Sequence, residues 1–198
     1  MCNFVTMNLD DWILYRITRE DREHTMTAAE VKKILGLVPH PCEGGFYIRT
    51  YESGELLPEA AFADSRYQGL RHTATAIYYL LEPGTFSEMH RLKSDEIFHF
   101  YAGDTVEMLQ LHEQGTGQII RIGNQLELSE RPQVLAPRGV WQGSHLVRGG
   151  GWALLGCTVS PGFEFDDYET ATREQLCSQW PAFRPLISAL TRPPSQDK

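Results

Sequence analysis

Cysteine is scarce in this sequence and is not spaced for metal binding. The 198 residues include four cysteines, at positions 2, 42, 157 and 177, and no two of them form a CxxC pair. Zinc knuckles need closely spaced ligands and disulfide frameworks need many cysteines, so neither class is indicated. We expect reduced thiols, at least two of them buried.

Long apolar runs and basic runs are also missing. No apolar stretch approaches the ~20 residues of a membrane-spanning helix, and residues 1–11 lack the charged and apolar regions of a signal peptide. The net charge of -8 argues against nucleic acid, because binding it requires clustered Lys and Arg. We therefore expect a cytoplasmic protein whose partners include neither a membrane nor a nucleic acid.

The chain has the length of a single β domain. With 198 residues it can bury a sizeable core without a second domain. We expect an N-terminal extension over residues 1–26, one domain over 27–192 and a polar tail over 193–198.

Helix signals occur near the two ends of this domain. Thr27 and Glu30 have the spacing of a capping box at the start of a helix, and Gly36 is a typical residue at which such a helix ends. Thr172 and Gln175 repeat the capping pattern near the C-terminus. Both patterns predict short helices that pack against a larger unit.

Short strands are predicted throughout the middle of the chain. Segments rich in β-branched and aromatic residues alternate with turns that contain Gly or Pro. The expected strands are 46–51, 73–81, 86–92, 96–101, 105–112, 118–122, 133–136, 144–147 and 152–160. Residues 52–68 have little periodicity, so we expect a long loop there. This pattern predicts an all-β jelly roll or barrel with short terminal helices.

One stretch has the spacing of a metal-binding motif but lacks one ligand. The first motif of the cupin superfamily reads GxxxxxHxHxxxExxxxxxG, and the residues that match it are Gly84, His90, Glu96 and Gly103. Leu92 stands at the second His position. Residues 137–142 resemble the second motif, PxGxxH, with Gln142 at the His position. The sequence therefore resembles a cupin double-stranded β-helix whose metal site has been replaced.

The two replacements decide our expectation for cofactors. Leu92 has no lone pair, and the amide oxygen of Gln142 is a poor ligand for transition metals, which favour imidazole and carboxylate. His90 and Glu96 alone are an incomplete set. We expect no bound metal and no other cofactor.

The same residues suggest a pocket for a small molecule. Residues two apart on a strand share a face, so His90 should point into the barrel, and Glu96 should return a carboxylate to the mouth of the same cavity. An imidazole can act as a general base, with Glu96 as its orienting or proton-carrying partner. Gln142 could hydrogen-bond a carbonyl or hydroxyl group, and Arg49 could pair with a carboxylate or phosphate.

Further candidates have a structural alternative of equal weight. Tyr47, Tyr51 and Phe98 could line the pocket or serve as wall and core aromatics. Glu43 precedes two glycines that would let the backbone approach a ligand, although a tight turn explains them equally well. His99 should face away from the lumen and form a structural hydrogen bond. Surface positions are expected for the remaining histidines, which are His24, His40, His72, His112 and His145.

Longer segments narrow the resemblance to one family. Residues 37–51, 75–81, 90–104 and 156–165 resemble the fifth cupin family, long catalogued as a domain of unknown function, and the resemblance covers roughly residues 28–180. It implies a barrel shaped like the deoxysugar epimerases of nucleotide-sugar pathways and commonly paired into a homodimer. The family has no settled activity.

Three functions remain open at this point. The first is a metal-independent epimerase or isomerase that acts on a sugar-like or other polar substrate with His90 as base. The second is a binding module without turnover. The third is a metal-dependent cupin enzyme, which the missing ligands disfavour.

Overall fold

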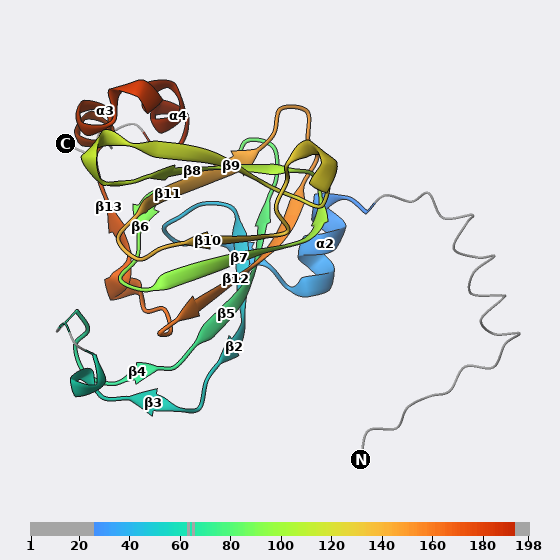
Figure 1. The fold of residues 1–198 in the computed structure, drawn as a ribbon. Coiled ribbons are helices and arrows are strands. Elements are labelled where there is room, and N and C mark those ends of the chain that lie inside the picture. The colour runs from blue at the N-terminus through green and yellow to red at the C-terminus, as the bar shows by residue number, and fades with distance from the viewer. Residues whose placement is uncertain (1–25, 63, 65, 193–198) are drawn as a thin grey trace, which may run out of the picture.

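The computed structural model describes residues 26–62, 64 and 66–192, and its ribbon shows two β-sheets packed face to face (Figure 1). The predicted extension falls almost entirely outside the described residues, and the polar tail does so completely. Among the described residues no helix is long and apolar enough to cross a membrane.

The strands of the described residues form two large antiparallel sheets and one small one. The first sheet has the order β1 (Val38–Pro39), β2 (Phe46–Glu52), β5 (Thr75–Leu81), β12 (Ala153–Ser160), β7 (Asp95–Gly103) and β10 (Gln133–Ala136). The second has the order β13 (Glu169–Thr170), β6 (Phe86–Arg91), β11 (Trp141–Leu146), β8 (Val106–Leu111) and β9 (Gly117–Ile122). Several neighbours in the sheets, such as β5 with β12 and β6 with β11, are distant in sequence, and this arrangement confirms the predicted jelly roll.

Side-chain alternation on these strands separates the lumen from the outer faces. On β8, Val106 and Met108 point into a core between the sheets, where they meet Phe98 of β7 and Leu155 of β12. Leu109, one residue further on, points outward into a second cluster. The period of two predicted from the sequence therefore sets which residues reach the lumen.

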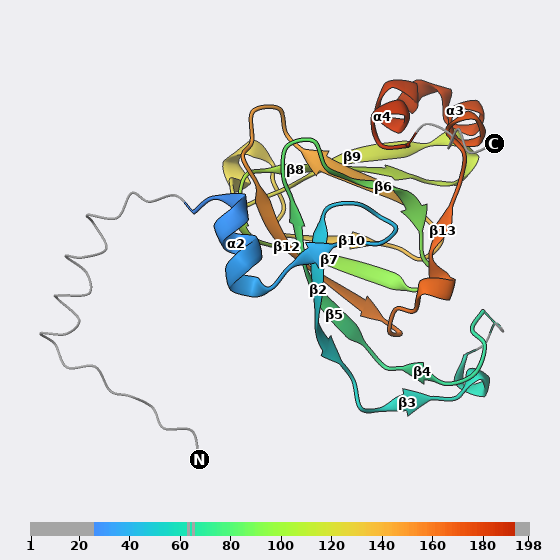
Figure 2. The same ribbon diagram turned by 180° about the vertical axis from the view of Figure 1, so that it is seen from behind.

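Short helices cover the outer faces of both sheets. The helix α2 (Ala28–Leu35) packs against the first sheet through Val31, and its capping box is formed as predicted, with the Glu30 amide donating to Thr27 Oγ1 at 3.3 Å. The helices α3 (Arg173–Gln179) and α4 (Arg184–Ala189) pack on the second sheet, as Figure 2 shows from behind. The Thr172 cap of α3 was predicted, whereas α4 was not.

The prediction of a long loop over residues 52–68 is wrong in part. This region contains β3 (Leu56–Leu57), which pairs with β4 (Arg71–His72), and the 3₁₀ turn η1 (Glu59–Ala61). Two-residue strands are too short for a periodic sequence pattern, so nothing in the composition signals them. The other 3₁₀ turns are η2 (Glu113–Gly115), η3 (Leu126–Leu128), η4 (Phe165–Asp167) and η5 (Pro181–Phe183).

Candidate functional site

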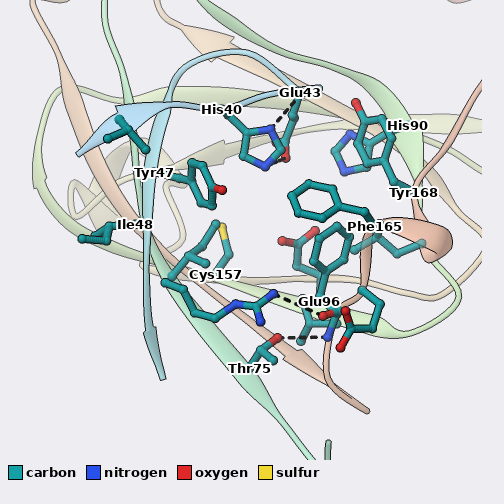
Figure 3. Close-up of a pocket in the computed structure, with 17 residues that line it drawn as sticks. His40, Glu43, Tyr47, Ile48, Thr75, His90, Glu96, Cys157, Phe165 and Tyr168 are labelled. Carbon is teal, nitrogen blue, oxygen red and sulfur yellow. Dashed lines mark hydrogen bonds and ion pairs between the residues drawn. The ribbon is translucent and has the colours of Figure 1, made fainter. Parts of the chain in front are cut away.

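A cavity of ≈ 350 Å³ occupies one end of the lumen. Strands β2, β5, β6, β7 and β12 supply its wall, and the turn over residues 38–43 and residues 163–168 close it (Figure 3). Seven apolar side chains line it, from Val38, Ile48, Ile77, Leu92, Val159, Phe163 and Phe165. The other lining residues carry polar groups, among them the carboxyl groups of Glu43, Glu96 and Glu164.

His90, Gln142 and Glu96 are brought together in the lumen, as the motif spacing predicts. His90 of β6 lies directly opposite Gln142 of β11 in the sheet register. The Gln142 amide Nε2 donates to Glu96 Oε2 at 2.6 Å and lies 3.4 Å from His90 Nε2. Gln142 is the bridge between the other two residues.

The hydrogen bonds of His90 fix its tautomer. Nδ1 lies 2.7 Å from the Glu88 carbonyl oxygen, which can only accept, so Nδ1 carries the hydrogen. In neutral His90 the Nε2 lone pair then faces the Gln142 amide. That contact, at 3.4 Å, is longer than a normal N–H···N or N–H···O bond, so the lone pair is weakly held.

Glu96 is held in its protonated form at neutral pH. Burial is the main cause, the negative charge of Glu43 adds to it, and the hydrogen bond from Gln142 opposes it; together they raise the pKa of Glu96 to about 8. Burial also raises the pKa of the neighbouring Cys157 thiol, which stays neutral. The site thus has a carboxylic acid close to an imidazole.

His40 is a second cavity imidazole, and its predicted surface position is wrong. Its side chain is 5% exposed. The turn between β1 and β2 carries it over the end of the lumen, and Gly44 and Gly45 adopt positive φ there. The sequence predicts a surface loop here, because the residues of that turn show no periodic pattern of apolar side chains.

The His40 ring has the opposite tautomer to His90. The backbone N–H of Glu43 donates to Nδ1 at 2.8 Å, so Nε2 carries the hydrogen, 3.9 Å from Glu43 Oε2. Burial lowers the pKa of His40, and the Glu43 carboxylate only partly opposes this. The Ser87 hydroxyl donates to the other Glu43 oxygen, Oε1. His40 is therefore a neutral hydrogen-bond donor.

The remaining predicted residues separate into two groups. Glu43, Tyr47 and Arg49 line the cavity, and Arg49 Nη2 donates to the Phe163 carbonyl at 3.4 Å. Tyr51 is 53% exposed and lies beyond a register shift in β2, which breaks the two-residue alternation after Arg49. Phe98 is 1% exposed and packs in the core. Neither Tyr51 nor Phe98 lines the cavity.

Two other placements concern His99 and Gln142. His99 does not line the cavity, and its Nε2 lies 3.3 Å from Thr158 Oγ1, as a structural role predicts. Gln142 reaches the site through its contacts with Glu96 and His90 although it is not part of the cavity lining, and within the described part of the chain its Oε1 has no hydrogen-bond partner.

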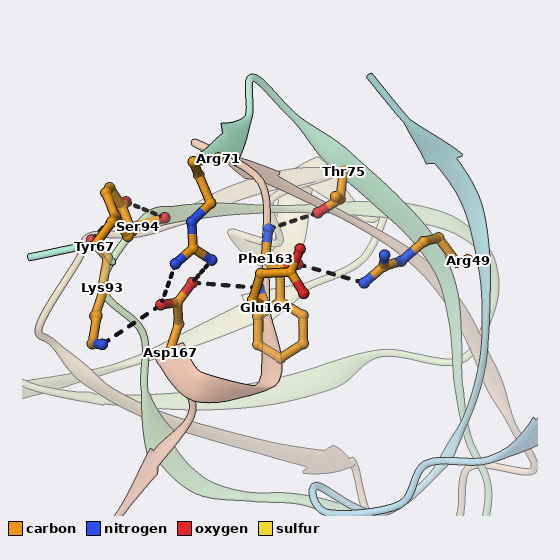
Figure 4. Close-up of polar contacts among 9 residues, drawn as sticks. All are labelled: Arg49, Tyr67, Arg71, Thr75, Lys93, Ser94, Phe163, Glu164 and Asp167. Carbon is orange, nitrogen blue, oxygen red and sulfur yellow. Dashed lines mark hydrogen bonds and ion pairs between the residues drawn. The ribbon is translucent and has the colours of Figure 1, made fainter. Parts of the chain in front are cut away.

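Residues 163–168 contribute side chains that sequence reasoning missed. Tyr168 stacks on His90 with ring centroids 4.8 Å apart, and its buried hydroxyl has no hydrogen-bond partner among the residues that the structure describes. Asp167 anchors the segment to Arg71 through a buried ion pair of 2.8 Å (Figure 4). The Phe163 amide donates to Thr75 Oγ1 at 3.0 Å. No motif marks this segment, because tertiary contacts alone bring it to the cavity.

The residues do not fit the metal site of the first cupin motif. Leu92 lines the cavity at one ligand position, and Gln142 uses its amide to hold Glu96 at another. Among the described residues no group of three His, Cys, Asp or Glu side chains could hold a metal ion. We derive no reaction step through a metal.

The chain matches the model of a protein family, and it is similar to solved structures, two of which it covers over almost their whole length. Residues 29–171 match the family described as Cupin superfamily (DUF985). An X-ray structure of a Shewanella oneidensis protein is 35% identical, with a TM-score of 0.73, over 85% of this chain and 99% of that one. A hypothetical protein from Leishmania major is 31% identical, with a TM-score of 0.75, over 85% and 100%. No curated protein matches.

Proposed function

Since the chain belongs to the Cupin superfamily (DUF985) family, we propose that its barrel binds a small polar molecule and catalyses a metal-independent proton transfer, as an epimerase or isomerase does. One observation carries this proposal. A buried carboxylic acid, Glu96, and the imidazole of His90 share the amide of Gln142 beside the cavity. A carboxyl group whose pKa is raised to about 8 can donate a proton at neutral pH, and an imidazole can accept one.

The proposed chemistry starts from a carbon next to a carbonyl group. His90 Nε2 takes the proton from this carbon, the electron pair of the broken C–H bond forms a C=C bond, and the π pair of the carbonyl group moves to its oxygen. The protonated carboxyl of Glu96 donates to that oxygen, so the enol forms without a net charge in the cavity. Return of a proton to the carbon gives the isomer or epimer. His40 Nε2–H is a second donor at the cavity wall.

Deuterium exchange tests this function without advance knowledge of the product. Nucleotide sugars, sugar phosphates, 2-oxo acids and cationic amino sugars are incubated with the protein in D₂O, and loss of the α-proton signal is followed by NMR. We expect exchange with at least one compound, reduced ~100-fold or more in His90→Gln. The control is His99→Gln, since His99 lies outside the cavity. Exchange that is unchanged in His90→Gln would refute the role of His90.

A binding module without turnover is the second candidate. It is favoured by the 1% exposure of His90, whose ring is covered by Tyr168 and whose Nε2 faces the Gln142 amide. In that case His90, Glu96 and Gln142 would only orient a ligand. A compound that binds, as measured by calorimetry, but shows no exchange in D₂O would favour this candidate.

We also propose a homodimer that forms through the open edge of β2. In the described part of the chain, β1 pairs only with Phe46 and Tyr47, so residues 49–52 have no strand on that side. Val38 and Tyr51 are exposed apolar side chains at this edge. Unpaired edges tend to pair with another chain. Sedimentation that gives a monomer of 22.5 kDa at micromolar concentration would contradict the dimer.

A cytoplasmic location completes the proposal. The cysteines of the described residues, Cys42, Cys157 and Cys177, are free thiols, and two of them are buried as expected. Free thiols are typical of a reducing compartment.

A further inference from the structure

Glu43 places a buried negative charge at the cavity wall. Its side chain is 12% exposed, and Oε1 accepts a hydrogen bond from the neutral Ser87 hydroxyl. Among the residues that the structure describes, no Lys or Arg forms an ion pair with it, and its closest titratable contact is His40 at 3.9 Å. A buried charge of this kind normally has a charged partner.

The arginines near Glu43 are already engaged in other ion pairs, and the neighbouring His40 is uncharged. Burial lowers the pKa of His40, so this imidazole does not supply the missing charge. Arg49 forms an ion pair with Glu52, and Arg192 forms one with Glu88 at 3.4 Å. Electrostatic repulsion from the negative charge of Glu43 therefore acts on other groups of the cavity, and it helps to raise the pKa of Glu96 and of Tyr168.

The walls of the cavity are rich in aromatic rings. His40 and Tyr47 make an edge contact with centroids 4.6 Å apart, and Phe163 and Phe165 do so at 5.3 Å. Figure 3 shows Tyr47 and Phe165 on opposite sides of the site, with Glu43 and His40 at one end and Glu96 at the other. Ring faces carry negative electrostatic potential and attract organic cations.

We propose, on the basis of the binding role proposed above, that the ligand of this cavity is a small organic ammonium ion that also carries a hydroxyl or carbonyl group. The ammonium group lies beside Glu43, its carbon substituents contact the rings of Tyr47 and Phe165, and the oxygen reaches the Glu96 end. A cavity of ≈ 350 Å³ with apolar walls suits an organic cation better than a bare metal ion, which needs several oxygen, nitrogen or sulfur ligands.

A matched pair of probes separates charge from shape. Choline and 3,3-dimethylbutan-1-ol have nearly the same shape, but only choline is charged. Isothermal titration calorimetry at constant ionic strength should give a choline Kd at least about tenfold lower than that of the alcohol. In Glu43→Gln, which keeps an acceptor for Ser87, the two Kd values should become similar. Glu169→Gln, an exposed change of the same net charge, should leave the ratio as in the parent.

A second variant covers the case in which Glu43→Gln does not fold. Tyr47→Leu retains an apolar side chain but removes one ring, and we expect choline to weaken about threefold or more while the alcohol changes little. Equal or weaker binding of choline than of the alcohol, or binding of neither, overturns the cation proposal. Deuterium exchange with an uncharged or anionic compound would then leave the proton-transfer function intact. Choline binding without exchange in any compound of the screen, the cationic amino sugars included, would support the cation and refute the turnover.

Discussion

The two ends of the barrel lumen share strands β5, β7 and β12 but differ in how they are filled. On β7, Glu96 and Phe98 are two residues apart and share a face, yet Glu96 borders the cavity whereas Phe98 packs among Tyr79, Val106 and Leu155. One end is filled with apolar side chains, and the other is hollow and held by polar contacts. The comparison teaches that the two-residue alternation of a strand decides which side chains point into the lumen. The size of those side chains, and the loops that cover the end of the barrel, decide whether the lumen is filled or hollow there.

The packed end should give the largest stability loss. Phe98→Ala removes a fully buried ring and leaves a cavity in the core, so we expect the free energy of unfolding to fall by about 3–5 kcal/mol. Urea denaturation followed by tryptophan fluorescence measures this change. Phe98→Leu should lose clearly less, because most of the apolar volume is kept. A Phe98→Ala loss below ~1 kcal/mol would mean that this end is not a packed core.

The hollow end should depend on an ion pair instead. Asp167→Asn leaves the buried Arg71 guanidinium without its carboxylate partner, and we expect a loss of about 3 kcal/mol in the free energy of unfolding. The double variant Arg71→Met with Asp167→Leu should recover much of that loss, because neither charge is then left buried. If Asp167→Asn is neutral, residues 163–168 are not anchored in this way.

Glu96 should make the hollow end sensitive to pH. Its pKa is raised from 4.5 to about 8 in the folded protein, so the folded state holds the proton more tightly than the unfolded state does. Its unfavourable contribution is absent below pH 4.5, grows as the pH rises from there, and is complete above about pH 8. When the pH is raised from 5 to 7, we expect the free energy of unfolding of the parent to fall by about 2 kcal/mol more than that of Glu96→Gln.

Parallel denaturation series of these two proteins isolate this effect from other titrating groups. A parent and a Glu96→Gln variant with the same pH dependence would contradict the protonated state of Glu96. The same series in Phe98→Leu serves as a control, because that substitution changes no titrating group.

His90 should affect ligand binding more than stability. His90→Ala removes the stacking on Tyr168, the hydrogen bond to the Glu88 carbonyl and a long contact with Gln142, so we expect a loss of about 1–2 kcal/mol, smaller than at Phe98 or Asp167. The thermal shift produced by any ligand found in the screen should disappear. A loss of several kcal/mol with an unchanged ligand response would assign His90 a structural role.

Much of the packed end could be predicted from the sequence, and less of the hollow end. Alternation of apolar and polar residues predicted the strands, because strand geometry is local. The spacing of Gly, His, Glu and Gly in the first motif predicted that His90, Glu96 and Gln142 lie together. His40 and Tyr168 escaped prediction, since aperiodic segments reach the cavity only through tertiary contacts such as Arg71 with Asp167. A register shift in β2 places Tyr51 outside the cavity. The prediction for Tyr51 was wrong because side-chain types do not indicate such a shift.

Metal content tests most directly whether the hollow end works by acid–base chemistry of its own side chains. Elemental analysis of the purified protein, dialysed without chelator, should find far less than one equivalent of Zn, Fe, Mn or Ni per chain, and the His90→Ala variant should be the same. About one equivalent per chain, lost in His90→Ala, would contradict the account.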